Sequence, residues 1–388
     1  MFNLFSMQNA FSRSFIAAVC VFQVLGCASD GDEEVIYVAP LPEIENQIEI
    51  DKLWSYRSDA DEEIFSKITP SIAYGKVFVA SIDGEVVALD RDSGDEVWEV
   101  DVESPLSGGV AAGNGIIIVT SEDAEVIALE EATGKELWRN LVSSEVLAPA
   151  GIGENMVVVN TVDGKLFALS AESGKRAWFY DRNVPVLSLR GTASAQIDRG
   201  AAVTGFANGK IAAFLIEKGA LIWEKRVASP TGRSELARMV DVDANPIIYG
   251  DRVYAASYNG NILALELRSG EVIWQRELST YQNLSVDISN VFATDQLSHV
   301  KAMNRLNGAT LWIQDQLENR QVTGAGITDK ALVVGDFEGY LHFIDKENGK
   351  FVGQVLMDSS GIGVQPLVDN GVIYAFSKDG LVTAYRVQ

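Results

Sequence analysis

Apolar residues along the chain fall into short runs separated by glycine-containing turns, and the pattern recurs about every forty residues. One unit, residues 83–98, reads DGEVVALDRDSGDEVW. In this unit an apolar run lies between an Asp-Gly turn and a Ser-Gly turn, and a tryptophan follows four residues after the second glycine. A fixed period of this length indicates an array of similar supersecondary units.

The order of turn, apolar run, turn and tryptophan is found, with decreasing strictness, in eight units. All seven tryptophans of the chain occupy the same position of the unit, which indicates a structural role for them. The seventh unit has Gly353 at this position, and the eighth ends at the C-terminus before reaching it. The tryptophans are Trp54, Trp98, Trp138, Trp178, Trp223, Trp274 and Trp312.

Each unit also contains strand-forming segments before its first turn. One is a continuous apolar run, such as residues 77–79 or 116–119, and continuous runs are typical of strands covered on both faces of their sheet. A short segment upstream, such as residues 68–73 or 108–112, completes four strands per unit. Eight such units predict an all-β fold, an eight-bladed β-propeller with four antiparallel strands per blade.

The two ends of the chain predict how the ring closes. Residues 52–57 carry Trp54, the one repeat tryptophan that has no strands of its own unit before it. We therefore expect a propeller over residues 51–388 in which N- and C-terminal strands share one blade. The C-terminal segment supplies three strands of that blade, near residues 363–367, 372–376 and 381–387.

Residues 1–26 have the features of a secretory signal peptide. Their apolar stretch, residues 15–25, is too short to span a bilayer. Residues 24–27, Val-Leu-Gly-Cys, resemble a bacterial lipobox, in which Cys27 is lipidated and becomes the mature N-terminus. The alternative is an ordinary cleaved signal followed by an unrelated cysteine.

Residues 27–50 have the composition of a flexible tether. Acidic residues are frequent, Lys and Arg are absent, and two prolines interrupt any helix. Like charges keep such a segment extended. Fully stretched from Cys27, the tether could reach on the order of 75 Å, so the propeller can sit well off the membrane.

The net charge of −23 excludes a nucleic-acid-binding surface of clustered Lys and Arg, and it disfavours adhesion to anionic lipid by charge alone. Both cysteines, Cys20 and Cys27, lie near the N-terminus. The predicted propeller therefore has neither a disulfide nor thiolate chemistry.

Two connections between units are longer than the others. The tryptophan spacing is 45 residues from Trp178 to Trp223 and 51 residues from Trp223 to Trp274, against 38 to 44 elsewhere. The extra residues lie in segments 181–189 and 227–242, directly after the tryptophan strands. Both segments join an outer strand to the inner strand of the next unit, so we expect them to be neighbours on the face that carries the Asp-Gly turns. Insertions on one face of a repeat ring often form its binding surface.

Each enlarged connection contains candidate partner-binding residues. The first has Leu187, Leu189 and Arg190, which combine apolar anchors with a charge of the kind enriched at interface hot spots. An alternative is that both leucines start the inner strand and fill the core. The second connection ends with Asp241 and Asp243. This acidic pair could be solvated, form a salt bridge or hold a cation, although a metal would require more oxygen ligands.

The signal with its lipobox, the acidic tether, the eight repeats, LSLRG at 187–191 and DVD at 241–243 together resemble the BamB family of Gram-negative lipoproteins. The resemblance covers the whole chain. It implies a non-enzymatic scaffold without a cofactor or metal, anchored through Cys27 to the periplasmic face of the outer membrane. The implied partners are the periplasmic domains of BamA, other lipoproteins of the β-barrel assembly complex, and unfolded outer-membrane proteins that the complex inserts. The matching partner-binding residues are Leu187, Leu189, Arg190, Asp241 and Asp243.

Two other classes of protein stay open. The units also resemble the tryptophan-docking repeat of quinoprotein dehydrogenases, which hold pyrroloquinoline quinone on the propeller axis beside a vicinal disulfide and Ca²⁺-ligating acids. No cysteine follows Cys27, and the only histidines are His299 and His342. His342 alternates with apolar neighbours on a predicted strand, a pattern typical of a structural residue. Composition also allows a propeller that binds cell-wall material or sugars.

Overall fold

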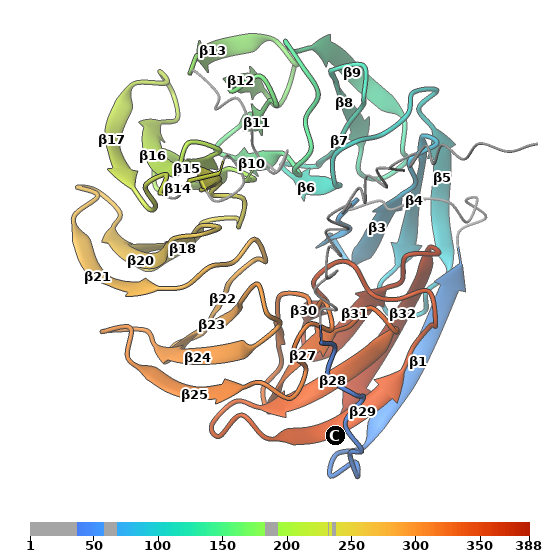
Figure 1. Ribbon diagram of the computed structural model, residues 1–388. Helices are drawn as coiled ribbons and strands as arrows, with labels where there is room; N and C mark the ends of the chain where they lie inside the picture. Colours follow the sequence, from blue (N-terminus) through green and yellow to red (C-terminus); the bar gives the residue numbers. More distant parts are fainter. Residues whose placement is uncertain (1–36, 58–67, 183–192, 232, 235–237) are drawn as a thin grey trace, which may run out of the picture. The chain divides into compact units, whose positions relative to one another are not determined.

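The recurring apolar runs form the strands of an eight-bladed β-propeller. The computed structural model describes residues 37–57, 68–182, 193–231, 233–234 and 238–388. In these residues thirty-two strands form eight four-stranded antiparallel sheets, which follow one another around a ring (Figure 1). The all-β class, the number of blades and the four strands per blade predicted from the repeats are thus confirmed. No helix in the described part of the chain is long and apolar enough to cross a membrane.

Blades 1 to 7 each consist of four consecutive strands, which follow one another from the innermost strand outward. Blade 1 contains β2 (Ser71–Ala73), β3 (Lys76–Ala80), β4 (Glu85–Asp90) and β5 (Glu96–Asp101). Blade 2 contains β6 (Ala111–Gly113), β7 (Ile116–Thr120), β8 (Glu125–Glu130) and β9 (Glu136–Leu141). Blade 3 contains β10 (Gly151–Gly153), β11 (Met156–Asn160), β12 (Leu166–Ser170) and β13 (Arg176–Tyr180). Blade 4 contains β14 (Gln196–Asp198), β15 (Ala201–Phe206), β16 (Lys210–Leu215) and β17 (Leu221–Arg226). Blade 5 contains β18 (Ile247–Tyr249), β19 (Arg252–Ala256), β20 (Asn261–Glu266) and β21 (Val272–Glu277). Blade 6 contains β22 (Ser285–Val286), β23 (Asn290–Thr294), β24 (Val300–Asn304) and β25 (Thr310–Gln314). Blade 7 contains β26 (Gly326–Ile327), β27 (Ala331–Gly335), β28 (Tyr340–Asp345) and β29 (Phe351–Leu356).

Blade 8 closes the ring with strands from both ends of the chain. Its order is β30 (Leu367–Asp369), β31 (Val372–Phe376), β32 (Leu381–Val387) and then β1 (Ile50–Arg57), which is the outermost strand. β1 pairs with β32 along its whole length, and its register shifts between Lys52 and Trp54. Every other outer strand has the same shift directly before its tryptophan position. β1 is therefore a true fourth strand, and the predicted closure is confirmed.

The tryptophans join each blade to the next. Each indole N–H donates to a backbone carbonyl in the turn between the last two strands of the following blade, and the indole face covers the glycine of that turn. At Gly219, for example, φ is +65° and an added Cβ would lie 2.5 Å from Trp178, so both backbone and space require glycine. This contact explains why both a turn glycine and a tryptophan recur in the repeat. The donor–acceptor pairs, at 2.6–3.0 Å, are Trp54–Arg91, Trp98–Glu131, Trp138–Ala171, Trp178–Ile216, Trp223–Leu267, Trp274–Arg305 and Trp312–Lys346.

The boundary between blades 7 and 8 is the one place where this contact is replaced. Blade 8 has no turn between its last two strands, because the chain ends after β32 and re-enters at β1. A tryptophan at position 353 would have no turn glycine to cover. Instead Ile48 and Ile50 fill the space, and an added Cβ on Gly353 would lie 3.0 Å from Ile48 and 3.1 Å from Ile50. The exception in the repeat is thus a consequence of ring closure.

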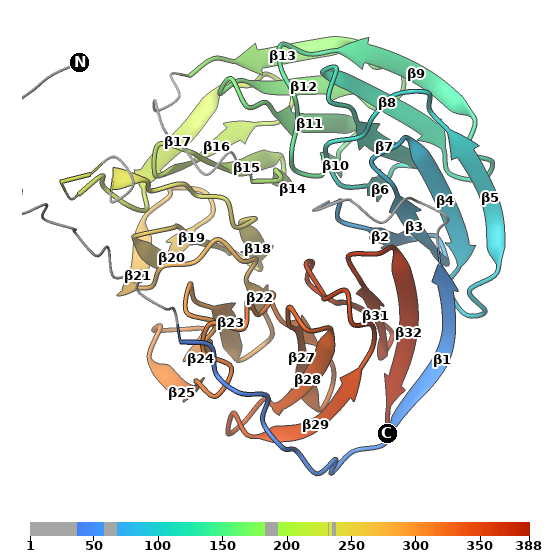
Figure 2. The same cartoon turned by 45° about the vertical axis from the view of Figure 1, so that its right-hand side comes forward.

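Residues 37–49, which we call the strap, differ from the sequence expectation. We expected a free tether up to residue 50, but the strap lies along blade 7 and leads into β1 (Figure 2). The Gln47 amide donates to the Val352 carbonyl of β29 at 2.8 Å. Residues 37–388 form a single unit, so the packed region begins at least fourteen residues earlier than the predicted boundary at 51.

The innermost strands of blades 1 and 8 begin later in the chain than predicted. β2 begins at Ser71 rather than at Ile68, and β30 begins at Leu367 rather than at Gly363. Pro70 and Pro366 stand directly before these strands, and proline lacks the amide hydrogen that a ladder requires. The second and third strands of each blade supply most of the buried apolar side chains, and they match the apolar runs of the sequence.

Candidate protein-interaction face

One face of the propeller carries all connections between blades. In each blade the turn between its second and third strands lies at the same end as the connection that leads from its fourth strand to the next blade. The two are hydrogen-bonded: the Leu106 amide, in the connection after blade 1, donates to the Ile82 carbonyl in the turn of blade 1 at 2.7 Å. We call this end of the ring the loop face, and the other end the opposite face.

The two enlarged connections are neighbours on the loop face. Segment 181–195 joins blades 3 and 4, and segment 227–246 joins blades 4 and 5, so blade 4 lies between them. Their described parts touch directly, because the Ser194 amide donates to Asn245 Oδ1 at 2.7 Å. Asn245 in turn donates its own amide to Asn283 Oδ1 at 2.9 Å, which links the second segment to the next connection. The two connections thus adjoin at Ser194 and Asn245, which follow the segments 181–189 and 227–242 that carry the extra residues; for those segments the juxtaposition stays a prediction.

Asp241 lies inside the second connection and not at its surface. Its side chain is 0% exposed, and its backbone carbonyl accepts a hydrogen bond from the Tyr258 amide at 2.9 Å. Val240 and Val242 on either side are also buried. A solvated position, one of the options that the sequence left open, does not apply to Asp241. Asp243 is half-buried and lies closer to the surface.

The residues Leu187, Leu189 and Arg190 lie outside the described residues. Their assignment to a partner-binding site, together with Asp241 and Asp243, stays a prediction. The described residues on either side of it are Arg182, two residues after β13, and Ala193, three residues before β14. The Ala193 carbonyl accepts a hydrogen bond from Thr204 Oγ1 at 3.1 Å.

A cluster of charged and aromatic side chains lies between the two enlarged connections. Arg182 forms an ion pair with Glu224, and its guanidinium lies 4.5 Å from the ring centroid of Phe206. Lys210 forms a second ion pair with Glu224. The Phe206 carbonyl accepts from the Val242 amide at 3.2 Å, which places the cluster against the second connection.

This cluster was missed in the sequence, although Arg182 falls inside the first enlarged segment and was a possible signal. The pKa of Lys210 is held below its ordinary value, mainly by desolvation and also by the positive charges of Arg182 and Arg226. Lys210 nevertheless faces one carboxylate, Glu224, that it shares with Arg182. Glu224 thus pairs with two cations, so the cluster keeps a net positive charge beside the second connection. A net positive charge suits the binding of an acidic protein surface.

Each of the two histidines pairs with an aspartate. His342 is 0% exposed, and its Nε2 lies 3.0 Å from Asp336 Oδ2, so the structural role predicted for it is confirmed. His299 lies in a turn, with Nδ1 3.3 Å from Asp295 Oδ2. Within the described ranges, no group of three or more His, Cys, Asp or Glu side chains is placed to hold a metal ion.

These features define a tryptophan-docking β-propeller whose two enlarged connections are joined on one face. The chain belongs to the BamB family: the family model for the outer membrane protein assembly factor BamB matches residues 82–314 and 296–388. The resemblance stated from the sequence motifs is thereby confirmed.

Relatives with the same name cover nearly the whole chain. The chain is 45% identical over 371 residues to the outer membrane protein assembly factor BamB of Kangiella koreensis, covering 95% of each. It is 45% identical over 366 residues to that of Pseudomonas aeruginosa, covering 94% of this chain and 96% of the relative. It is 38% identical over 369 residues to that of Escherichia coli, covering 92% of this chain and 94% of the relative.

Solved structures agree with the family and also share its fold with other classes of protein. BamB from Moraxella catarrhalis superimposes with a TM-score of 0.80 at 27% identity, covering 87% of this chain and 99% of that chain. A quinohemoprotein alcohol dehydrogenase from Pseudomonas putida gives a TM-score of 0.70 at 14% identity, covering 89% of this chain and 78% of that chain. At that identity the likeness shows a common fold alone.

Proposed function

We propose that this chain is a non-enzymatic scaffold of the outer-membrane β-barrel assembly complex, and that its loop face binds the periplasmic domains of BamA. The family supports a role in outer-membrane protein assembly. The observation that carries the assignment to the loop face is the direct contact between the two enlarged connections, Ser194 to Asn245. Two adjoining connections, each with inserted residues, would make one continuous surface, and such loops on a rigid ring commonly serve binding.

The proposed site consists of Leu187, Leu189, Arg190, Asp241 and Asp243, with the Arg182 cluster as its support. The leucines would enter a groove or lie along a strand edge of BamA, and Arg190 would pair with an acid. Because Asp241 is buried, we expect its substitution to act through the stability of the connection. Asp243 is the better probe of surface contact.

We further propose that the protein is lipid-anchored through Cys27 at the periplasmic face of the outer membrane. The lipobox-like residues 24–27 support the anchor, and the family name supports the membrane. Other lipoproteins of the complex and unfolded outer-membrane proteins are additional proposed partners. They would use loop-face surface or blade edges that the BamA contact leaves uncovered.

The binding site is tested by Leu189→Ala and Arg190→Ala. Each is expected to weaken affinity for the purified periplasmic domains of BamA by about 5- to 150-fold, which corresponds to about 1–3 kcal/mol for an interface anchor. Affinity is measured by calorimetry, and the melting temperature of each variant is measured beside it. Lys135→Ala is the control, because Lys135 is exposed in a turn of the opposite face.

The melting temperatures separate the two interpretations of the leucines. A Leu189→Ala variant that melts normally and binds poorly supports the site. A variant that melts early and, where folded, binds normally would make Leu189 a core residue and remove it from the site.

A further inference from the structure

The strap begins on the loop face, at the boundary between blades 6 and 7. The Ala39 amide donates to the Glu318 carbonyl at 3.0 Å, and Asn319 Nδ2 donates to the Tyr37 carbonyl at 2.7 Å. Glu318 and Asn319 lie in segment 315–325, the connection from β25 to β26. The described chain therefore enters the propeller among the inter-blade connections, on the same face as Asp241 and Asn245.

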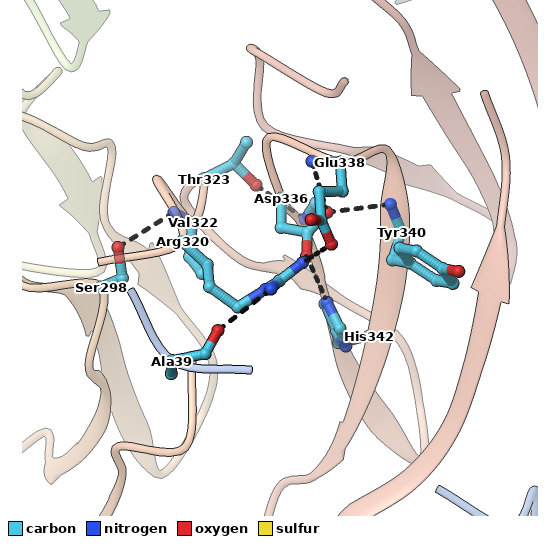
Figure 3. Close-up of polar contacts among 10 residues, drawn as sticks. Ala39, Ser298, Arg320, Val322, Thr323, Asp336, Glu338, Tyr340 and His342 are labelled. Carbon is cyan, nitrogen blue, oxygen red and sulfur yellow. Dashed lines mark hydrogen bonds and ion pairs between the residues drawn. The ribbon is translucent and has the colours of Figure 1, made fainter. Parts of the chain in front are cut away.

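A buried arginine holds this entry point. Arg320 is 2% exposed, and its Nη1 donates to the Ala39 carbonyl at 3.1 Å. Its Nε donates to Asp336 Oδ2 at 2.9 Å, and Nη2 pairs with Glu338 (Figure 3). The planar guanidinium thus joins two acids of blade 7 to one backbone carbonyl of the strap, a geometry that lysine could not reproduce. Ala39 itself is 6% exposed, so the strap covers the arginine.

The rest of the strap follows the outer edge of blade 7. Asn46 contacts the backbone of Gln354 twice, accepting from its amide at 2.8 Å and donating to its carbonyl at 3.2 Å. The Gln47 amide adds a backbone hydrogen bond to the Val352 carbonyl, so these contacts fix the strap along the outer edge of β29. Ile48 then fills the space beside Gly353. The strap is therefore held at both ends.

We infer that the strap fixes where the N-terminal anchor segment leaves the propeller: on the loop face, beside blades 6 and 7. This inference rests on the proposed lipid anchor at Cys27. Only ten residue steps separate Cys27 from Tyr37, so the segment can span at most about 35 Å, compared with about 75 Å if it were free to residue 50. The docked strap thus keeps the partner-binding loop face and the membrane attachment on the same side of the ring.

Two variants release the strap in different ways. Arg320→Ala removes the clamp, and Ala39→Arg puts a bulky charge at a buried position while leaving Arg320 and its acids intact. In each we expect the amides of Ala39 and Gln47 to exchange hydrogen about tenfold faster or more, as for a lost hydrogen bond. Arg139→Ala is the matched control, because Arg139 also joins two acids and a backbone carbonyl, but in blade 2. Rapid exchange of both amides in the unaltered protein would overturn the docked strap, whatever the state of Cys27.

Fluorescence energy transfer from the propeller to the membrane tests whether the loop face and the membrane attachment lie on the same side of the ring. The lipidated full-length protein is placed in vesicles with acceptor-labelled headgroups and carries a donor dye on one added cysteine. Gln296→Cys marks the loop face of blade 6, and Glu347→Cys marks the opposite face of blade 7; both positions are exposed. We expect stronger transfer from position 296, and a loss of this difference in Ala39→Arg.

Cys27→Ser separates the inference from the proposed function on which it rests. This variant is expected to stay in solution with a folded propeller and to give no transfer. Continued association after a salt wash would refute the lipid anchor. Equal transfer from positions 296 and 347 in the anchored, unaltered protein, or an unchanged difference in Ala39→Arg, would refute the strap as the element that sets the exit point.

Discussion

Removal of β1 will destabilise the propeller more than any single substitution, by at least about 5 kcal/mol in the free energy of unfolding. The shortened chain begins at residue 58 and leaves the edge of β32 without its partner strand. It also loses Trp54, whose indole N–H donates to the Arg91 carbonyl at 3.0 Å and whose ring lies 5.9 Å from that of Tyr374. Denaturant unfolding followed by tryptophan fluorescence measures the loss, and failure to fold is its extreme form.

Trp54→Ala is the companion variant for this deletion. Truncation of a docked tryptophan is expected to cost about 3–5 kcal/mol, so the substitution should account for part of the deletion's effect. Unfolding of the shortened chain at the same denaturant concentration as the intact protein would contradict ring closure through β1.

Asp336→Ala is expected to cost about 3–5 kcal/mol, because it leaves the buried guanidinium of Arg320 without its main counterion. Asp336 is 0% exposed and accepts from the Tyr340 amide at 2.9 Å as well as contacting His342. Thermal unfolding measures the loss. Asp163→Ala is the control: Asp163 pairs with Lys165 near the surface, and such a pair contributes about 0–1 kcal/mol. Equal losses in the two variants would contradict a special role for the buried network.

From the pKa of Asp336 we predict that the protein loses stability in acid. Burial alone raises the pKa of Asp336, but hydrogen bonding and charge from His342, the Tyr340 amide and Arg320 outweigh it, so the pKa lies below its ordinary value. A carboxyl whose pKa is lowered by folding stabilises the protein above its unfolded pKa, near 4, and this contribution is lost as the pH falls through the folded pKa. We therefore expect Asp336→Asn to show a shallower fall in stability below about pH 4 than the unaltered protein.

The repeat allowed the blade number and the closure to be predicted, because one local contact produces it. A turn glycine and a tryptophan both recur because each indole covers the glycine of the next blade, as Trp178 covers Gly219. The sequence shows that Gly353 replaces the repeat tryptophan, but it does not show why. The group that fills its space, Ile48, lies about three hundred residues away, and no local pattern connects the two.

The strap and the Arg320 network were missed for the same physical reason. Acidic residues and prolines correctly predict that segment 37–49 forms no helix, but they do not say whether its backbone finds partners. Those partners, Arg320 and the edge of β29, are distant in sequence. The burial of Asp241 is likewise a tertiary effect, because its apolar neighbours Val240 and Val242 pack between two blades.

The central claim, that the loop face binds BamA, is tested most directly by hydrogen exchange on the complex of the full-length protein with the periplasmic domains of BamA. The account predicts a stable complex in which segments 181–195 and 227–246 exchange more slowly than in the free protein. Turns of the opposite face, such as residues 131–135, should be unchanged. Absence of a complex, or protection confined to the opposite face, would contradict it.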